Sequence, residues 1–171
     1  MQTFRIRKAF LIPLGLLLLL CLTLLGVCIV HKEPLAKCLI LIFLLLPIVV
    51  LFLESLFRRI EVDKEHVVAH RLLRRKRLAF AELSEIETVM VKRRAFITLC
   101  AGDDFLIISN AYSRFPELVA ALLAPADETV VSETTREMAK EPPMKSSDIV
   151  SAWLAVGLLL FILYSQLVGH V

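Results

Sequence analysis

Three long apolar runs constrain this chain more than any other feature of its sequence. Residues 9–30 and 149–168 contain no charged side chain, and a third run begins near Leu35 and continues to Leu53. A helix needs roughly 20 apolar residues to cross about 30 Å of hydrocarbon at a rise of 1.5 Å per residue. The sequence therefore predicts three transmembrane helices, at about 10–30, 36–56 and 149–168.

The first apolar run could instead be a secretory signal, because Arg5, Arg7 and Lys8 precede it. It is longer than the usual apolar region of such a signal, however, and no small-residue cleavage site follows it. Hydrophobic residues make up 58% of the whole chain, above the roughly 45–50% apolar usage of soluble domains. We therefore expect the first span to be retained and to form a transmembrane hairpin with the second, over residues 1–57.

The basic residues near the spans indicate an orientation. Arg5, Arg7 and Lys8 precede the first span, and Arg58 and Arg59 follow the second, whereas the link at residues 31–34 holds a single Lys. Because basic residues close to span ends favour the cytoplasmic side, we expect the N terminus and the middle of the chain to be cytoplasmic. The third span would then carry the C terminus outside, in a multi-pass protein of the cell membrane.

Between the second and third spans the pattern changes to short β-type runs bounded by charged or turn-forming residues. A Gly-Asp break at residues 101–104 predicts a hairpin turn, and apolar residues at helical spacing from Phe115 to Leu123 predict one helix of about ten residues. We expect this domain to occupy 58–125, followed by a polar linker at 126–148 with a brief helix around Thr134 to Lys140. The six predicted strands are Ile60–Asp63, His66–Leu73, Leu78–Phe80, Thr88–Lys92, Ala95–Cys100 and Phe105–Ser109.

One phrase within this domain carries a family resemblance. Residues Leu78 to Val89 read Leu-Ala-Phe-Ala-Glu-Leu-Ser-Glu-Ile-Glu-Thr-Val, and two strands around an Ala-Gly-Asp-Asp turn and a single amphipathic helix follow them. This arrangement resembles the bacterial PH-like (pleckstrin homology-like) membrane proteins, in which such a phrase joins the third and fourth strands and the domain often follows two transmembrane helices. The third span departs from that common arrangement.

The resemblance implies an α+β membrane protein of the bacterial inner membrane. Its cytoplasmic part would be an antiparallel β-barrel or sandwich capped by one C-terminal helix and acting as a non-catalytic binding scaffold. The expected core residues are Ile86, Val89, Val91, Ile97 and Leu99.

The sequence offers little chemistry for catalysis. It contains no dinucleotide fingerprint, phosphate-binding loop, zinc-protease motif or nucleophile elbow. His66 and His70 have a spacing that binds metals on a helix, but no Cys or carboxylate completes a ligand set. We therefore expect no enzyme activity, no cofactor and no metal.

Glu54 is the one acidic residue within the apolar runs, and it lies four residues before Arg58. On a helix this spacing brings the two side chains together, so we expect an ion pair at the membrane edge. A carboxylate within a membrane can also mark a transport or catalytic path, which is the less favoured hypothesis for Glu54.

A run of basic residues is the strongest candidate for a binding surface: Arg71, Arg74, Arg75, Lys76 and Arg77. A nucleic-acid module is normally basic as a whole, but residues 58–148 hold equal numbers of basic and acidic residues, so we expect no nucleic-acid partner. Because spans tether this segment at both ends, its cations would stay near anionic headgroups. The sequence therefore predicts binding of membrane lipids or of a protein, while a solvated loop that only enforces topology explains the charge equally well.

An alternative function is that of an accessory subunit in a larger membrane complex, with other membrane-protein subunits as partners. Small residues in the spans would permit close helix approach: Gly15, Gly26, Ala152, Ala155 and Gly157.

Overall fold

The computed structural model describes residues 1–92, 94–143 and 147–169. The chain forms two compact units, which are not consecutive in sequence. The β unit comprises Met1–Arg7 and Phe57–Lys145, and the helical unit comprises Lys8–Leu56 and Ser146–Val171.

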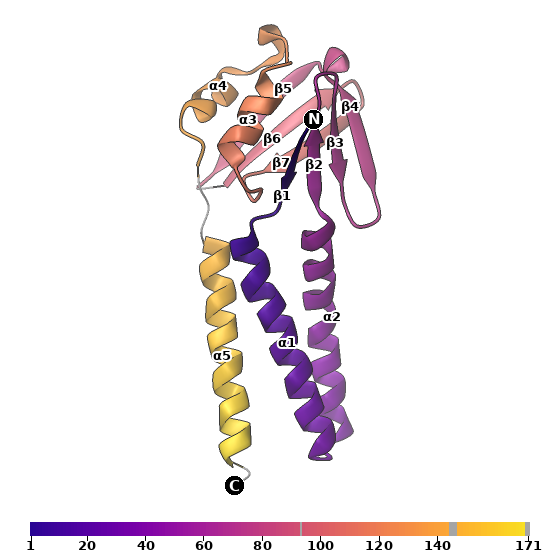
Figure 1. The fold of residues 1–171 in the computed structure, drawn as a ribbon, viewed down its shortest axis with the longest axis vertical. Coiled ribbons are helices and arrows are strands. Elements are labelled where there is room, and N and C mark those ends of the chain that lie inside the picture. The colour runs from indigo at the N-terminus through magenta and orange to yellow at the C-terminus, as the bar shows by residue number, and fades with distance from the viewer. Residues whose placement is uncertain (93, 144–146, 170–171) are drawn as a thin grey trace. The chain divides into compact units, whose positions relative to one another are not determined.

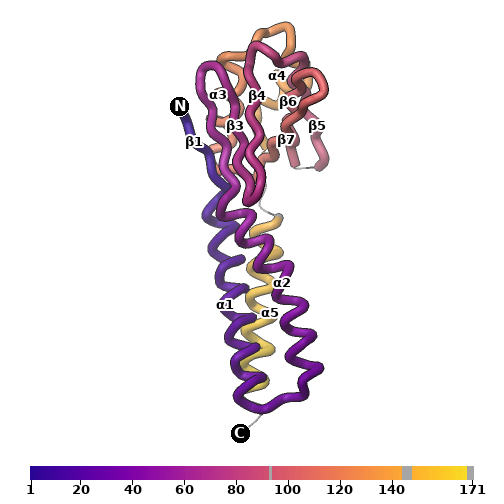
Figure 2. Tube along the Cα trace, turned by 90° about the vertical axis from the view of Figure 1, so that its right-hand side faces the viewer, coloured from indigo at the N-terminus to yellow at the C-terminus, as the bar shows by residue number. Residues whose placement is uncertain are grey.

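Three helices make up the helical unit: α1 (Lys8–Val30), α2 (Leu35–Phe57) and α5 (Ser147–Gly169). Each is long and apolar enough to cross a membrane by length and composition, in agreement with the three predicted spans. Figure 2 shows α1 and α5 running side by side. Leu14, Leu17 and Leu20 of α1 pack with Val156 of α5. Along α2, in contrast, no residue is buried.

A four-stranded antiparallel sheet forms one half of the β unit, with β1 (Gln2–Arg5), β2 (Arg59–Val62), β3 (His66–His70) and β4 (Arg75–Ala79) in sequence order. β1 precedes α1 and β2 follows α2, so the helical hairpin is inserted between two neighbouring strands (Figure 1). The sequence did not predict β1. It is only four residues long, and its one large apolar side chain, Phe4, gives no alternation to detect.

The second sheet follows a short helix, η1 (Phe80–Glu82), and contains β5 (Glu85–Val91), β6 (Arg94–Ala101) and β7 (Asp104–Ser109). Its strands are also antiparallel and in sequence order. Ala101 pairs with Asp104, which leaves a two-residue turn in which Gly102 has φ +58°. A positive φ at the first of two turn residues is typical of a type II′ hairpin, and glycine adopts it without steric cost.

The expected core is confirmed for Ile86, Ile97 and Leu99, which are buried, and is wrong for two residues of β5. Val89 and Val91 are 47% and 51% exposed. Side chains along a strand alternate between its faces, and the inward positions of β5 belong to Ile86 and Thr88. The two valines therefore fall on the outer face.

After β7 the chain forms α3 (Phe115–Leu123), as the helical spacing predicts. Most of its apolar stripe is buried: Phe115, Leu118, Val119 and Leu122. The β unit is thus a mixed α+β structure with two antiparallel sheets and a helix whose apolar face is covered.

The segment expected as a polar linker, 126–148, carries two further helices, η2 (Glu128–Val130) and α4 (Glu133–Lys140). α4 confirms the brief helix predicted around Thr134 to Lys140, whereas η2 was not predicted. α4 is attached to β5 by Thr135, whose hydroxyl lies 2.8 Å from that of Thr88 and donates to the carbonyl of Ile86 at 3.1 Å. The sequence predicted a linker here because the segment is polar. The side chains that attach it to β5 are threonines, and a polar residue is not expected in a core. Residues 144–146 of this segment lie outside the described residues.

The Asp127 side chain caps η2, accepting hydrogen bonds from the amide and the hydroxyl of Thr129, each at 3.0 Å. These bonds favour the charged carboxylate and lower the pKa of Asp127. Since the folded pKa is below the unfolded one, this cap stabilises the fold above the ordinary carboxyl pKa. Its contribution is lost as pH falls through the folded pKa.

Candidate functional site

The basic run forms a hairpin, His66–Ala79, made of β3, β4 and their connection, which we call the basic hairpin. The connection is Arg71–Arg74, closed by a hydrogen bond from the amide of Arg71 to the carbonyl of Arg74 at 2.8 Å. The sequence predicted a loop over Arg71 to Arg77, but Arg75 already pairs with His70 in the sheet. A strand with one face in solvent can hold charged residues. The start of β4 was therefore missed, because its basic residues were interpreted as a loop.

The two faces of β4 carry different side chains. Leu78 is buried and pairs with Val67, and Lys76 points to the same inner face as Leu78. Arg75 and Arg77 point to the outer face. The basic residues therefore divide between the two sides of the sheet.

Two of the five candidate cations are engaged within the β unit. The Lys76 ammonium lies 2.7 Å from a carboxylate oxygen of Asp104 and 5.1 Å from the ring centre of Phe105. Arg77 contacts the imidazole Nε2 of His66 at 3.0 Å. In the described part of the chain, these two side chains have local partners.

The other three candidates, Arg71, Arg74 and Arg75, are exposed. Among the described residues, no side-chain hydrogen bond or ion pair to any of them is formed. Because a guanidinium group presents a planar set of donors that matches carboxylate or phosphate, these three side chains can bind an external anion without breaking an internal contact.

A pocket of about 300 Å³ lies between the basic hairpin and β7. Its lining combines the cations of the hairpin with an apolar wall: Ala69, Arg71, Arg74, Lys76, Phe105, Leu106 and Ile107. Asp104 neutralises Lys76, so Arg71 and Arg74 supply the net positive charge. The pocket therefore has the chemistry to hold an anionic group that carries an apolar portion.

The strand register extends the positive surface to residues that the sequence reasoning used only for orientation. Arg5, Arg59, His70 and Arg75 occupy matching positions on the four neighbouring strands. Glu61 offsets part of this charge, since its carboxylate lies 3.1 Å from Arg59 and 3.1 Å from His70. Like charges on directly opposite residues destabilise a sheet, so an anion bound at this row would relieve repulsion. Only the pairing of β1 with β2 could have revealed Arg5 as a member.

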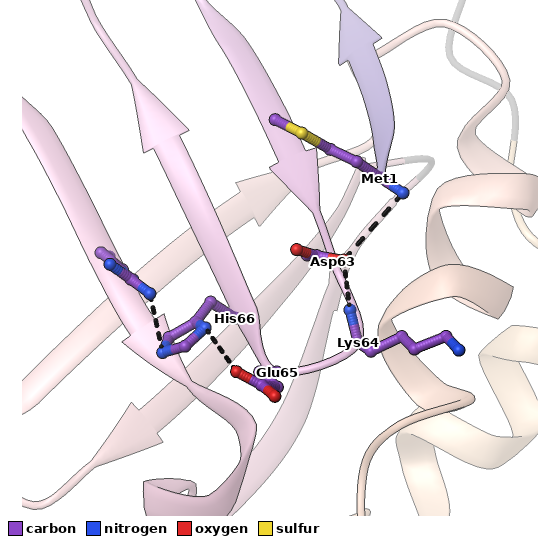
Figure 3. Close-up of polar contacts among 6 residues, drawn as sticks. Met1, Asp63, Lys64, Glu65 and His66 are labelled. Atoms are coloured by element: carbon purple, nitrogen blue, oxygen red, sulfur yellow. Dashed lines mark hydrogen bonds and ion pairs between the residues drawn. The ribbon is translucent and has the colours of Figure 1, made fainter.

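The other end of the same sheet carries charged groups of both signs. Figure 3 shows the turn between β2 and β3, where Asp63 accepts a hydrogen bond from the Lys64 amide at 2.8 Å and lies 4.0 Å from the Met1 amino group. Glu65 follows, 3.9 Å from His66. Asp63 and Glu65 are thus balanced at this turn by Lys64 and the Met1 amino group, whereas arginines are enriched at the opposite end of the sheet.

Arg58 contacts Tyr112 within the β unit. Its Nε donates to the hydroxyl of Tyr112 at 3.0 Å, and its guanidinium lies 5.6 Å from the centre of that ring. Glu54 belongs to the helical unit and Arg58 to the β unit, so their expected ion pair stays a prediction.

His66 and His70 lie on the same face of β3 and contact Arg77 and Glu61 respectively. Within the described ranges, no group of three or more His, Cys, Asp or Glu side chains has an arrangement that could hold a metal ion.

Comparison of this chain with protein-family models, with curated proteins and with solved structures finds no match.

Proposed function

We propose that this chain is a non-catalytic, multi-pass membrane protein whose β unit binds the anionic surface of the membrane that its helices cross. The observation that carries this proposal is the exposed cluster of Arg71, Arg74 and Arg75, at the end of the four-stranded sheet from which the chain leads into α1 and α2.

Chain connectivity keeps this end of the sheet close to the spans. Arg5 lies three residues before Lys8, where α1 begins, and Arg59 lies two residues after Phe57, where α2 ends. Since an extended residue spans at most about 3.3–3.6 Å, these cations are within about 10 Å of the ends of the apolar helices. That distance is comparable to the Debye length of about 8–10 Å at physiological ionic strength.

The energetics favour lipid binding at such a distance. Arg75 lies two strands from Arg59 in the sheet, roughly 10 Å away. Each Lys or Arg close to an anionic leaflet contributes about 1 kcal/mol, so the three free arginines would supply about 3 kcal/mol before ordering costs when the sheet lies with this end against the membrane surface.

The pocket between the hairpin and β7 would receive a phosphorylated headgroup against Phe105, with Arg71 and Arg74 as donors. Lys76 and Arg77 would have to give up internal contacts, so we assign them a smaller role.

We further propose that the β unit is a PH-like domain and that it is cytoplasmic, in a bacterial inner membrane. Four antiparallel strands, then three, then a helix with a buried apolar stripe support the first assignment. The basic residues flanking α1 and α2 support the second.

The test uses the full chain in nanodiscs of phosphatidylcholine, with or without phosphatidylglycerol. We expect phosphatidylglycerol to slow amide hydrogen exchange over residues 71–75, and we expect substitution of Arg71, Arg74 and Arg75 by Gln to abolish that slowing. A control variant with the same charge change elsewhere, Lys64→Gln, Lys92→Gln and Lys140→Gln, should keep it.

Equal exchange in both kinds of disc would argue against binding of anionic lipid. The accessory-subunit alternative has its own support, because no residue of α2 is buried and its surface is free for a neighbouring subunit. If the chain, purified in mild detergent, brings down one other membrane protein in stoichiometric amount, and the Gln variant still does so, that alternative would be favoured.

A further inference from the structure

The tip of the basic hairpin carries two leucines in solvent. Leu72 is 37% exposed and Leu73 is 91% exposed. Tight connections between strands usually hold Gly, Asn, Asp or Ser, which satisfy the turn and stay hydrated. Neither leucine serves such a purpose, and Leu73 is among the most exposed apolar side chains in the described part of the chain.

The register fixes which end of the sheet these leucines occupy. Arg59, the first residue of β2, pairs with His70, the last residue of β3. Counting outward from that pair, Leu72 is two residues beyond the sheet on one strand, and Phe57 is two residues beyond it on the other. Phe57 is the residue at which the apolar helix α2 ends.

The charges beside the leucines identify what could cover them. Arg71 and Arg74 flank the pair directly, and both are exposed. An apolar protein groove would require these guanidinium groups to be desolvated or paired with acidic residues. A bilayer surface accepts both kinds of side chain at once, because apolar residues enter the boundary between headgroups and acyl chains while cations remain among the phosphates.

We propose that Leu72 and Leu73 insert into the headgroup–acyl boundary of the membrane that α1 and α2 cross, with Arg71 and Arg74 at the phosphates. This inference rests on the proposed function and deepens it, since the hairpin then binds lipid through apolar contact as well as charge. The hairpin would act as a fixed wedge that orients the β unit on the membrane surface.

The experiment exploits the single tryptophan of the chain, Trp153. In a Trp153→Phe background, Leu73→Trp places an indole at the tip, and Lys64→Trp places one at the turn between β2 and β3, at the opposite end of the same sheet. Each full-length variant is reconstituted in phosphatidylcholine–phosphatidylglycerol vesicles. Fluorescence is then quenched from the lipid with acyl-brominated phosphatidylcholine and from the water with acrylamide.

For Leu73→Trp we expect blue-shifted emission, several-fold stronger quenching by brominated lipid than for Lys64→Trp, and protection from acrylamide. Full acrylamide quenching without lipid quenching would overturn the proposal, because the tip would then be in water. Protection from both quenchers would also overturn it, since the tip would be buried against protein. Leu72→Trp repeats the measurement in case the first variant does not fold.

A second pair of variants separates this inference from the proposed function. Leu72→Ser with Leu73→Ser should reduce the protection of residues 71–75 even in discs of pure phosphatidylcholine, while leaving its dependence on phosphatidylglycerol. If the serine variant matches the native chain in both discs, insertion is refuted and charge-based binding stands. If the dependence on phosphatidylglycerol is absent in the native chain, the proposed function fails, whatever the depth of the tip.

Discussion

At the scale of single residues, the Thr88–Thr135 pair is the contact that turns a polar segment into part of the fold. Thr135 is fully buried and Thr88 almost so, and their hydroxyl oxygens are 2.8 Å apart. The Thr135 hydroxyl also lies 2.9 Å from that of Ser132. A buried hydroxyl that loses its hydrogen-bond partners destabilises the fold by its full desolvation free energy.

We therefore predict that Thr135→Val, which keeps the shape but removes the hydroxyl, lowers the free energy of unfolding by about 1–3 kcal/mol. Thr88→Val should cost less, because Thr135 retains Ser132 and Ile86 as partners. Chemical unfolding in detergent, followed by hydrogen exchange of β5 amides, measures both.

The double variant provides the check on this pair. Two groups in one network should not be additive, so Thr88→Val should be nearly neutral once Thr135 is already Val. Strict additivity would mean that the two hydroxyls do not interact. Thr98→Val, on the outer face of neighbouring β6, should change stability by less than about 0.5 kcal/mol.

Burial of single residues was predicted correctly where apolar character was enough to decide it. The prediction was wrong where burial depends on which face of the strand a residue occupies. Ile97 and Leu99 are two residues apart and both point inward, as expected for alternation. Val89 and Val91 have the same spacing and similar apolar character, but the opposite phase. Nothing local distinguishes the two cases, because the phase of β5 is set by its pairing with β6 and by α4 on its inner side.

At the scale of elements, β1 shows how a short strand can be essential to a domain that lies mainly elsewhere in the sequence. Its side chain Phe4 is 0% exposed and pairs across the sheet with Ile60. β1 also covers one edge of β2, whose amide and carbonyl groups would otherwise be unpaired.

We predict that Phe4→Ala destabilises the β unit by about 3–5 kcal/mol, the usual cost of removing a buried phenyl ring. Faster hydrogen exchange of the β2 amides, with unchanged exchange in α1 and α5, would be the expected signature. Thr3→Ala is the matched control, because Thr3 is next to Phe4 but its side chain is exposed. This substitution should change the free energy of unfolding by less than about 0.5 kcal/mol. Equal effects of the two substitutions would contradict a structural role for β1.

The other strands were predictable in position because each contains apolar or β-branched residues between clear breaks, but not always in their bounds. β5 begins at Glu85 and not at Thr88, and β3 ends at His70 and not at Leu73. β1 and the start of β4 were missed because they are mostly polar. Arg75 to Arg77 form a strand through pairing with Val68 to His70, so long-range contact decides their conformation. The free arginines of the candidate site could be found by composition. The apolar tip, the pocket beside β7 and the contribution of Arg5 could be found only once the strands were paired.

At the scale of the whole molecule, the pairing of β1 with β2 constrains membrane topology independently of charge. The two strands are neighbours in one sheet, yet α1 and α2 separate them in sequence. Paired strands must lie on the same side of a membrane, so α1 and α2 either both cross it or both stay on one side. The basic residues that flank α1 and α2 favour the cytoplasmic side for both strands. α5 would then carry the chain across the membrane once more.

We predict that Gln2→Cys and Asp103→Cys are both protected from a membrane-impermeant maleimide in intact cells, whereas Lys32→Cys, between α1 and α2, is labelled. Cys28 and Cys38 lie close to that link and Cys100 is a part-exposed free thiol of the β unit, so all three are replaced by Ser in every variant. Permeabilising the cells should make the first two positions reactive, since Gln2 and Asp103 are both exposed.

The possible outcomes separate sheet pairing from orientation. Labelling of Gln2→Cys and Asp103→Cys from opposite sides would contradict the β1–β2 pairing in the membrane. Labelling of both in intact cells, with Lys32→Cys protected, would preserve the sheet and reverse the proposed orientation. In that case the basic hairpin would face the outer leaflet, and its anionic partner would have to be sought there.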